Sequence, residues 1–124
     1  MRILIDTHIL LWCLEDSPKL TAVARRLIED PDNEIYVSKA TAWEIEIKRM
    51  LGKLTIADDF MERIEEGFSW LPIELRHVKE LRTLPSIHRD PFDRMLLAQA
   101  KCESMTLLSH DDTLPQYGDF VRRV

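Results

Sequence analysis

Two aspartates stand at the ends of short apolar segments that lie far apart in the sequence. Asp6 directly follows residues 3–5, and Asp111 comes two residues after the run at 105–109. If both segments are parallel strands of one sheet, their carboxyl ends meet at the edge where open α/β sheets bind ligands. Either aspartate could instead cap the helix that follows it, and the sequence leaves both interpretations open.

Glu44 lies in a segment, 39–53, whose apolar spacing predicts a helix. The acid falls beside the apolar stripe, whereas Glu46 and Arg49 fall on the opposite face. A salt bridge to Lys48, four residues on, would contribute only about 0.3–0.5 kcal/mol and does not explain an acid at the border of the core. We therefore expect Glu44 to be functional. The apolar stripe itself is expected to consist of Ala40, Trp43, Ile47, Met50, Leu51 and Leu54.

Asp93 lies near the start of a second predicted helix, at 91–103, which has Pro91 at its first position. Asp90 is the expected N-cap of this helix. An acid in the first turn is also favoured by the helix dipole, which gives Asp93 a structural interpretation as well. We nevertheless expect Asp93 to point towards the sheet, because it shares a face with apolar residues. Those residues are Leu96, Leu97 and Ala100.

Four carboxylates at one edge of a sheet repel one another unless a cation is bound between them. Ligation by oxygen alone favours Mg²⁺ or Mn²⁺ over Zn²⁺. Such an ion suits the hydrolysis of a phosphodiester, because it neutralises the phosphate, lowers the pKa of a bound water and stabilises the leaving oxygen. The sequence therefore predicts a site for Mg²⁺ or Mn²⁺ formed by Asp6, Glu44, Asp93 and Asp111.

The segments between these acids alternate between strand-like and helix-like patterns over the 124 residues. This alternation is typical of a parallel sheet covered on both faces by helices. We expect an α/β fold in one domain, 1–124, with about five strands. The expected strands are 3–5, 34–37, 68–73, 105–109 and 119–121. The expected helices are 8–15, 20–30, 39–53, 58–66, 75–83, 91–103 and 112–116.

The composition, with 45% hydrophobic and 31% charged residues, is that of a globular protein and not of a disordered chain. The apolar run at 9–14 is too short to span a bilayer, and no signal peptide is expected. Cys13 and Cys102 are expected to be buried thiols in a reducing cytoplasm. The net charge of −5 by itself disfavours a nucleic-acid-binding function.

Several short motifs, taken together, resemble one family. Ile-Asp-Thr-His at 5–8 precedes Leu-Leu-Trp at 10–12, and Ser-Lys-Ala-Thr-Ala-Trp-Glu-Ile occupies 38–45. The run His-Arg-Asp-Pro-Phe-Asp-Arg-Met-Leu follows at 88–96, and Leu-Leu-Ser-His-Asp at 107–111. In this order and spacing, over nearly the whole chain, the motifs resemble those of the VapC-like toxins of the PIN-domain family.

The resemblance implies a three-layer α/β/α fold, a homodimer, and cleavage of RNA that requires Mg²⁺ or Mn²⁺. It also implies a co-encoded antitoxin protein whose tail lies across the active site. Position by position, Asp6, Glu44 and Asp93 match the three core acids of the family. Asp111 matches the more variable fourth acid, for which Asp112 is the alternative.

Other residues acquire expected roles from the same resemblance. Thr7 and Ser109 match hydroxyls that orient carboxylates or bound water. His8 stands where many members carry Asn or Ser, and we interpret it as a variant near the site. We expect it to cap a helix or pack in the core rather than to act in catalysis. Trp12 and Trp43 are expected in the core or at a dimer interface.

Grouping several acids in one site also accounts for the acidic net charge, since a bound metal ion would reverse the local sign. Cations around the mouth of the site would then hold RNA phosphates. We expect Arg89 and Arg94 to contact RNA, with Lys48 as a further candidate. Two more cations are expected at the mouth, Lys53 and Arg76.

The early apolar run also bears on association. Leu10, Leu11, Trp12 and Leu14 place more apolar surface on one predicted helix than a small domain is expected to bury. We therefore expect a homodimer with part of the early helices at its interface.

Two other classes of function remain open at this point. Another metal-dependent phosphohydrolase, or a receiver-like phosphoacceptor, would use a similar sheet. A receiver needs paired acids after its first strand and a lysine after its last, and neither is present. A non-catalytic PIN-like protein that only binds a partner is disfavoured by the intact acids at all four positions.

Overall fold

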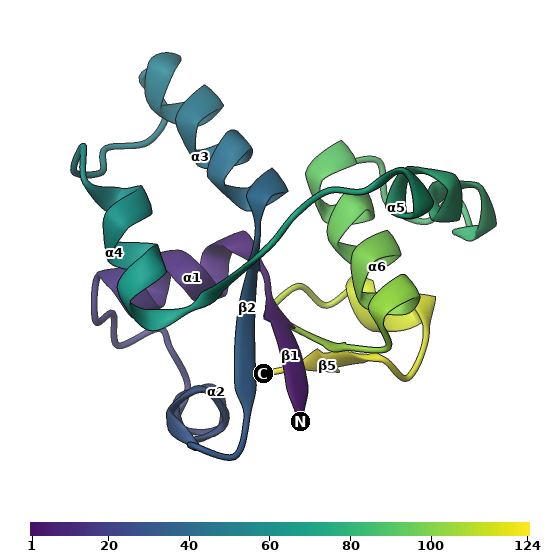
Figure 1. The fold of residues 1–124 in the computed structure, drawn as a ribbon, viewed down its shortest axis with the longest axis horizontal. Coiled ribbons are helices and arrows are strands. Elements are labelled where there is room, and N and C mark those ends of the chain that lie inside the picture. Colours follow the sequence, from purple (N-terminus) through teal and green to yellow (C-terminus); the bar gives the residue numbers. More distant parts are fainter.

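The computed structural model describes residues 1–124 and contains one sheet of five strands. The strand order is β3-β2-β1-β4-β5, and every pair of neighbours is parallel. This confirms the predicted parallel α/β sheet, with β1 at its centre (Figure 1). The strands are β1 (Arg2–Ile5), β2 (Glu34–Ser38), β3 (Ser69–Leu71), β4 (Thr106–Ser109) and β5 (Val121–Arg123).

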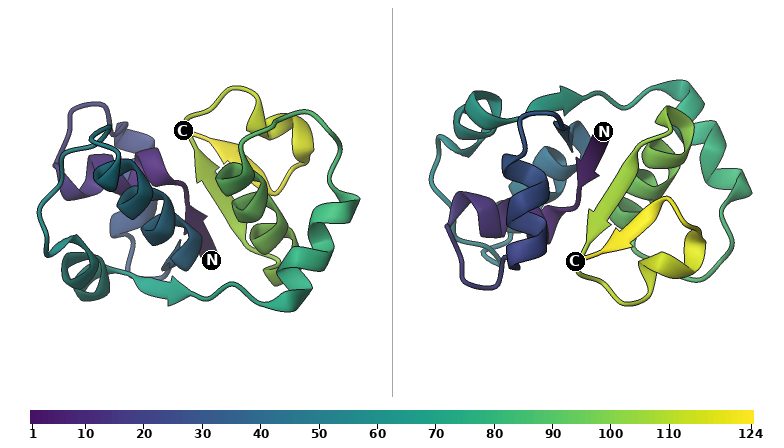
Figure 2. Two further views of the ribbon diagram at one scale, coloured as in Figure 1. Left: turned by 90° about the horizontal axis from the view of Figure 1, so that it is seen from above. Right: turned by 90° about the horizontal axis from the view of Figure 1, so that it is seen from below.

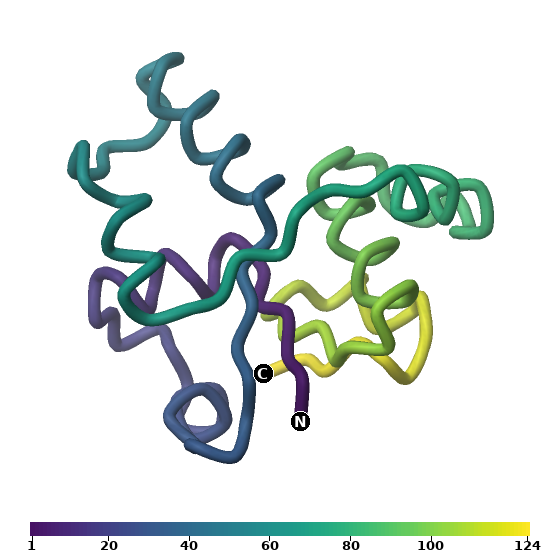
Figure 3. Tube along the Cα trace, viewed as in Figure 1, coloured from purple at the N-terminus to yellow at the C-terminus, as the bar shows by residue number.

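Helices cover both faces of the sheet, as predicted, and give the fold three layers (Figures 1 and 2). The first four lie on one face: α1 (Thr7–Leu14), α2 (Ala22–Glu29), α3 (Lys39–Met50) and α4 (Phe60–Gly67). After α4 the chain passes through β3 to the other side (Figure 3). That side carries α5 (Leu75–Glu80), η1 (Leu81–Thr83), α6 (Pro91–Glu103) and η2 (Leu114–Tyr117), the two η elements being 3₁₀ turns.

The two apolar cores follow from the alternation of side chains along each strand. Ile3 and Ile5 belong to the core beneath α1–α4, whereas Leu4, between them, belongs to the core beneath α6. Leu107 and Leu108 divide in the same way. A strand buried on both faces has to be apolar throughout, which explains the uninterrupted runs in β1 and β4.

The last strand, β5, is not apolar throughout. We expected a strand at 119–121, but β5 begins at Val121 and ends with Arg122 and Arg123, both exposed. It is an edge strand that pairs only with β4, so its outer residues meet water and charged side chains are tolerated there.

The apolar stripe predicted for α3 is partly wrong. The side chains of Trp43, Met50 and Leu51 are 60%, 78% and 64% exposed. The buried face of α3 instead carries Ala40, Thr41, Glu44 and Ile45. For Met50 and Leu51 the reason is that α3 extends away from the sheet beyond its first turns (Figure 1). Trp43 lies nearer the start of α3 and contacts the edge of Phe92 on α6, with ring centroids 5.2 Å apart, instead of entering the core.

The early apolar run is largely accommodated within the chain. Leu10 is fully buried, and Leu11, Trp12 and Leu14 are half-buried against the first core. The apolar surface of this run is therefore mostly covered within one chain, and a homodimer through the early helices stays a prediction.

Two smaller features of the chain complete the description. The thiols at 13 and 102 are free but only half-buried, which corrects the expectation of two buried cysteines. None of the helices combines the length and the apolar character needed to cross a membrane.

The packing of α3 yields a stability prediction. Ile45 is completely buried, so Ile45→Ala should lower the free energy of unfolding by about 2–5 kcal/mol in a urea melt. Leu75 is 68% exposed on α5, and Leu75→Ala should change it by less than about 0.5 kcal/mol. Equal losses in the two variants would mean that α3 does not pack through the face described here.

Candidate metal centre

The candidate site is a small polar cavity where β1 and β4 end, where α1 and α6 begin, and beside Glu44 and Lys48 of α3. Its volume is about 80 Å³, and no hydrophobic residue lines it. A cavity of this size has room for an ion and a few water molecules, since about 10–15 Å³ of volume on this measure is enough for one water. The lining residues are Asp6, Thr7, His8, Glu44, Lys48, Asp90, Asp93 and Asp111.

Asp6 is both a helix cap and a wall of this cavity. Its N–H donates to the carbonyl of Leu108 at 3.1 Å, which continues the β1–β4 ladder. Its Oδ1 accepts from the N–H of Ile9 at 2.9 Å and so caps α1. Burial raises the pKa of the Asp6 carboxyl, and hydrogen bonding to Ser109 and Ile9 offsets only part of that rise. The two sequence interpretations of Asp6 are therefore compatible.

Glu44 is buried, at 4% exposure, and both of its oxygens are occupied. The hydroxyl of Thr7 donates to Oε1 at 2.6 Å, and the ammonium of Lys48 donates to Oε2 at 2.6 Å. The hydrogen bond to Glu44 raises the pKa of Lys48, to which the charges of Asp90 and Asp93 also contribute. The predicted Glu44–Lys48 pair thus exists, and it places a cation inside the acidic cavity.

Asp93 contacts a residue that the sequence analysis did not select. Its Oδ2 lies 2.8 Å from Nε2 of His88, in the loop before α6. Burial raises the pKa of Asp93 to about 6; the hydrogen bond from His88 opposes this rise, and the charges of Asp90 and Asp6 add to it. The signal for His88 in the sequence was only its place five residues before Asp93, because loops have no periodicity that would orient a side chain.

Asp90 is the N-cap of α6, as predicted. Its Oδ1 accepts from the N–H groups of Phe92 at 2.8 Å and Asp93 at 3.1 Å. It also lines the cavity, which the sequence analysis did not foresee. The cap and the candidate ligand are therefore neighbours within one acidic cluster.

Of the two acids after β4, Asp111 lines the cavity. Its Oδ1 accepts from the N–H and the hydroxyl of Thr113, at 2.8 and 2.7 Å. Partial burial raises the pKa of Asp111, but these hydrogen bonds and nearby histidines outweigh it and leave the pKa below its usual value. Asp112 instead pairs with Arg123 outside the cavity. Ser109, fully buried, accepts from the N–H of Asp111 at 3.0 Å and so orients this turn.

The structure places His8 near the site, as expected, because its side chain is exposed and lines the cavity. The expected capping or core role is wrong, since the side chain is not buried and the cap of α1 is Asp6. The imidazole lies in a stacked arrangement with Trp12 at 6.1 Å between ring centroids. His8 is the second residue of α1, two residues after the cap Asp6, and at this position its side chain faces solvent at the cavity.

The predicted cations divide into two groups. Lys48 lines the cavity, and Arg89 is exposed beside it, in a neighbouring hollow formed with Ser86, His88 and Arg94. The expectation that Arg76 lies at the mouth is wrong, because it pairs with Glu74 and Glu103. Glu103 is the last residue of α6, whereas the cavity lies at the first turn of that helix. Lys53 is exposed beyond the end of α3 and does not line the cavity either.

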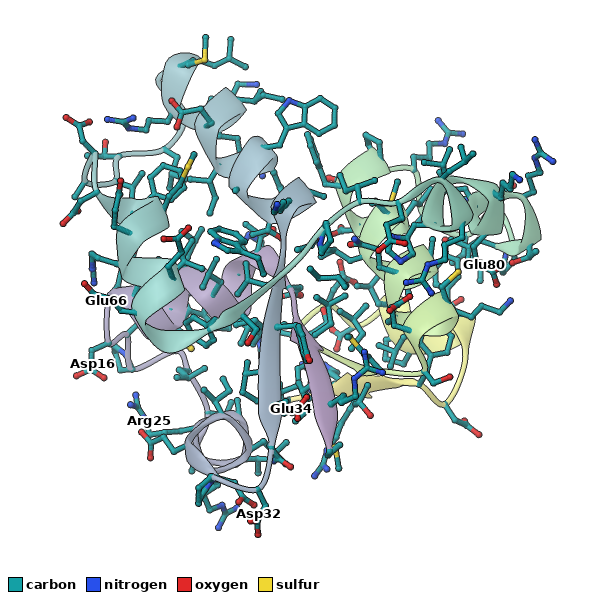
Figure 4. All side chains as sticks on the ribbon, viewed as in Figure 1. Asp16, Arg25, Asp32, Glu34, Glu66 and Glu80 are labelled. Carbon is teal, nitrogen blue, oxygen red and sulfur yellow. The ribbon has the colours of Figure 1, made fainter.

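Acidic charge is not confined to the cavity. Asp32, Glu34 and Glu66 lie on the periphery, around β2 and the helices α2 and α4 (Figure 4). Part of the net charge of −5 therefore comes from a surface remote from the cavity, and the site alone does not account for it.

The donor set fits a hard divalent cation. Five carboxylates line one small polar cavity, and burial raises the pKa of two of them, Asp6 and Asp93, because their charges are poorly solvated. A divalent cation bound by their oxygens would relieve that cost.

Residues 3–119 match the family model of the PIN domain. The chain belongs to the PIN-domain family. No protein of curated function matches the chain closely enough to extend this assignment.

Solved structures share the fold of this PIN domain. VapBC2 from Rickettsia felis, bound to a DNA fragment from its promoter, gives a TM-score of 0.73 at 12% identity over 99% of this chain and 98% of that one. A toxin–antitoxin complex from Klebsiella pneumoniae gives 0.68 at 16% identity over 98% and 99%. FitAcB from Neisseria gonorrhoeae gives 0.62 at 22% identity over 90% and 88%. At these identities the likeness establishes the fold alone.

The crowding of Asp93 predicts a pH-dependent stability. Because its pKa is raised from 3.8 to about 6, the folded protein binds more protons than the unfolded chain between these values and loses stability as pH rises through them. In EDTA, Asp93→Asn should therefore stabilise the protein at pH 8 by on the order of 1–2 kcal/mol, and by little at pH 4.

Asp90→Ala serves as the contrasting variant in the same urea melts. It removes the N-cap of α6 and should cost about 1 kcal/mol. If Asp93→Asn were the destabilised variant at pH 8, Asp93 would be a structural residue. The repulsion and desolvation of its carboxylate in the cavity would then not lower stability.

Proposed function

We propose that this PIN domain is a metal-dependent endoribonuclease, the toxin of a toxin–antitoxin pair. The observation that carries the proposal is the meeting of Asp6, Glu44, Asp93 and Asp111 in one polar cavity at the carboxyl edge of the sheet. The similar structures of VapBC2 and of the Klebsiella pneumoniae toxin–antitoxin complex support the assignment to such a pair.

The four carboxylates would hold Mg²⁺ or Mn²⁺. Such an ion, when bound, supplies charge neutralisation at the phosphodiester and lowers the pKa of a water nucleophile. The hydroxyl of Thr7 fixes the orientation of Glu44 through its 2.6 Å hydrogen bond. Ser109 accepts from the N–H of Asp111 and also hydrogen-bonds to Asp6, so hydroxyls position three of the four acids.

The cations beside the cavity would position RNA. Lys48 already lies within it, and Arg89 is exposed on the adjoining loop, so we propose both as phosphate contacts. Arg94 lines the same hollow as Arg89, and we keep it as a proposed phosphate contact. Its Nη1 donates to the carbonyls of Pro85 and His88, so it also holds the loop that carries Arg89.

An antitoxin and a second copy of the chain are the proposed protein partners. The antitoxin would cover the acidic cavity with its tail. The exposed apolar side chains at the far end of α3, Met50 and Leu51, together with Trp43, favour this helix over α1 as the dimer interface.

The nuclease assignment is tested with purified chain, structured RNA and Mn²⁺, with and without EDTA. Cleavage should require the metal ion, and Asp6→Asn and Glu44→Gln should reduce it to background while the proteins remain folded. The matched control is Asp112→Asn, an acid outside the cavity, which should cleave at nearly the wild-type rate. Equal cleavage by Asp6→Asn and wild type would exclude this cavity as the active site.

The association state is tested by light scattering over a wide range of concentration. The chain should behave as a dimer, and the double substitution Met50→Lys with Leu51→Lys should make it monomeric, because charge would replace the apolar contact. Leu75→Lys, at an equally exposed apolar residue on α5, should leave the dimer intact. A monomer at every concentration in the unsubstituted protein would refute the dimer.

A further inference from the structure

His88 forms a compact group with two of the cavity acids. One potential ligand atom from each of His88, Asp93 and Asp111 lies within 4.8 Å of the others. The three side chains are partly buried, and they come from the loop before α6, from its first turn and from the turn after β4. The imidazole therefore lies among the carboxylates, although the four-acid pattern of the sequence does not include it.

The loop that carries His88 is fixed from two directions. The N–H of His88 donates to the hydroxyl of Tyr117 at 2.7 Å, and Tyr117 belongs to η2. From α6, Nη1 of Arg94 donates to the carbonyls of Pro85 at 2.9 Å and His88 at 3.3 Å, and to the hydroxyl of Tyr117 at 3.3 Å. These contacts hold the backbone at the residue whose ring faces Asp93, so the ring is placed before any ligand arrives.

The spacing of the donor atoms suits a shared ion. Nε2 of His88 and Oδ2 of Asp93 are 2.8 Å apart. Adjacent ligands of an octahedral ion with bonds of about 2.1 Å lie about 3.0 Å apart, so little movement would bring both atoms into one coordination sphere. Asp111 keeps one carboxyl oxygen free of the hydrogen bonds that Thr113 donates to Oδ1.

We propose that His88 is a nitrogen ligand of a divalent metal ion that it shares with Asp93 and Asp111, and that this nitrogen makes the site prefer Mn²⁺ to Mg²⁺. The inference rests on the proposed function only in requiring that the cavity bind a metal ion. Oxygen ligands alone suit Mg²⁺, whereas imidazole adds affinity for transition metals. His88 thereby changes the expectation of all-oxygen ligation that the acids suggest.

Pulsed electron paramagnetic resonance on the full chain loaded with Mn²⁺ tests the ligand directly, because a metal-bound imidazole nitrogen modulates the spin echo. The unsubstituted protein should show this nitrogen coupling. His88→Asp, which exchanges the nitrogen for an oxygen, should abolish it. His110→Asn is the matched control and should retain the coupling. His110 follows β4, directly before Asp111, but its ring hydrogen-bonds to the carbonyl of Val124 and is not part of the His88 group.

Metal affinities provide a second readout that does not involve RNA. The ratio of Mn²⁺ to Mg²⁺ affinity, measured by competition, should fall by about tenfold or more in His88→Asp. Tyr117→Phe removes the hydroxyl that holds the N–H of His88, so it should weaken Mn²⁺ binding by a smaller factor and keep the nitrogen coupling. Circular dichroism establishes that each variant is folded.

Three results would overturn the assignment of His88. They are the lack of nitrogen coupling in the unsubstituted protein, its persistence in His88→Asp, and an unchanged ratio of affinities in that variant. The first result needs no substitution and so decides the question even if His88→Asp does not fold. None of these three results changes the expectation that Asp6→Asn abolishes RNA cleavage. The cleavage assay therefore tests the nuclease proposal independently of the role of His88.

Discussion

Carboxylates confined to one small cavity repel one another and lose hydration, and the surrounding structure offsets that cost at several points. The ammonium of Lys48 lies 2.6 Å from Glu44, and the ring of His88 lies 2.8 Å from Asp93. The N-termini of α1 and α6, which are capped by Asp6 and Asp90, direct partial positive charge at the same cavity. Even so, the pKa of Asp6 and of Asp93 stays raised, which is the residual electrostatic cost that a divalent cation would remove.

Parallel strand pairing is what brings the acids together. Ile5 is paired with Leu108, and the N–H of Asp6 extends the ladder by one more bond to the carbonyl of Leu108. Asp6 and Asp111 therefore leave the sheet at the same edge. A slip of one residue in this register would turn Ile5 and its neighbours to the opposite face, so the apolar cores and the acidic cavity depend on the same alignment.

The strands, most helices and the convergence of four acids were predictable because periodicity and segment ends are encoded in local sequence. Which face of α3 is buried was not predictable from the sequence, because it depends on how far the helix follows the sheet. Arg76 was misplaced because a sequence does not tell which end of α6 a neighbouring helix will meet. His88 was missed for a related reason: its position depends on Tyr117 and Arg94, which act on a loop from two other elements.

The strand order also has a temporal meaning during protein synthesis. The central strand β1 is made first and finds β2 soon afterwards, but its other neighbour, β4, begins only at Thr106. A growing chain therefore carries Asp6 without Leu108, Ser109 and Asp111 beside it until the segment that contains β4 has left the ribosome. The acidic cavity is incomplete until Asp111 has been made, so whatever chemistry it supports starts only after that point.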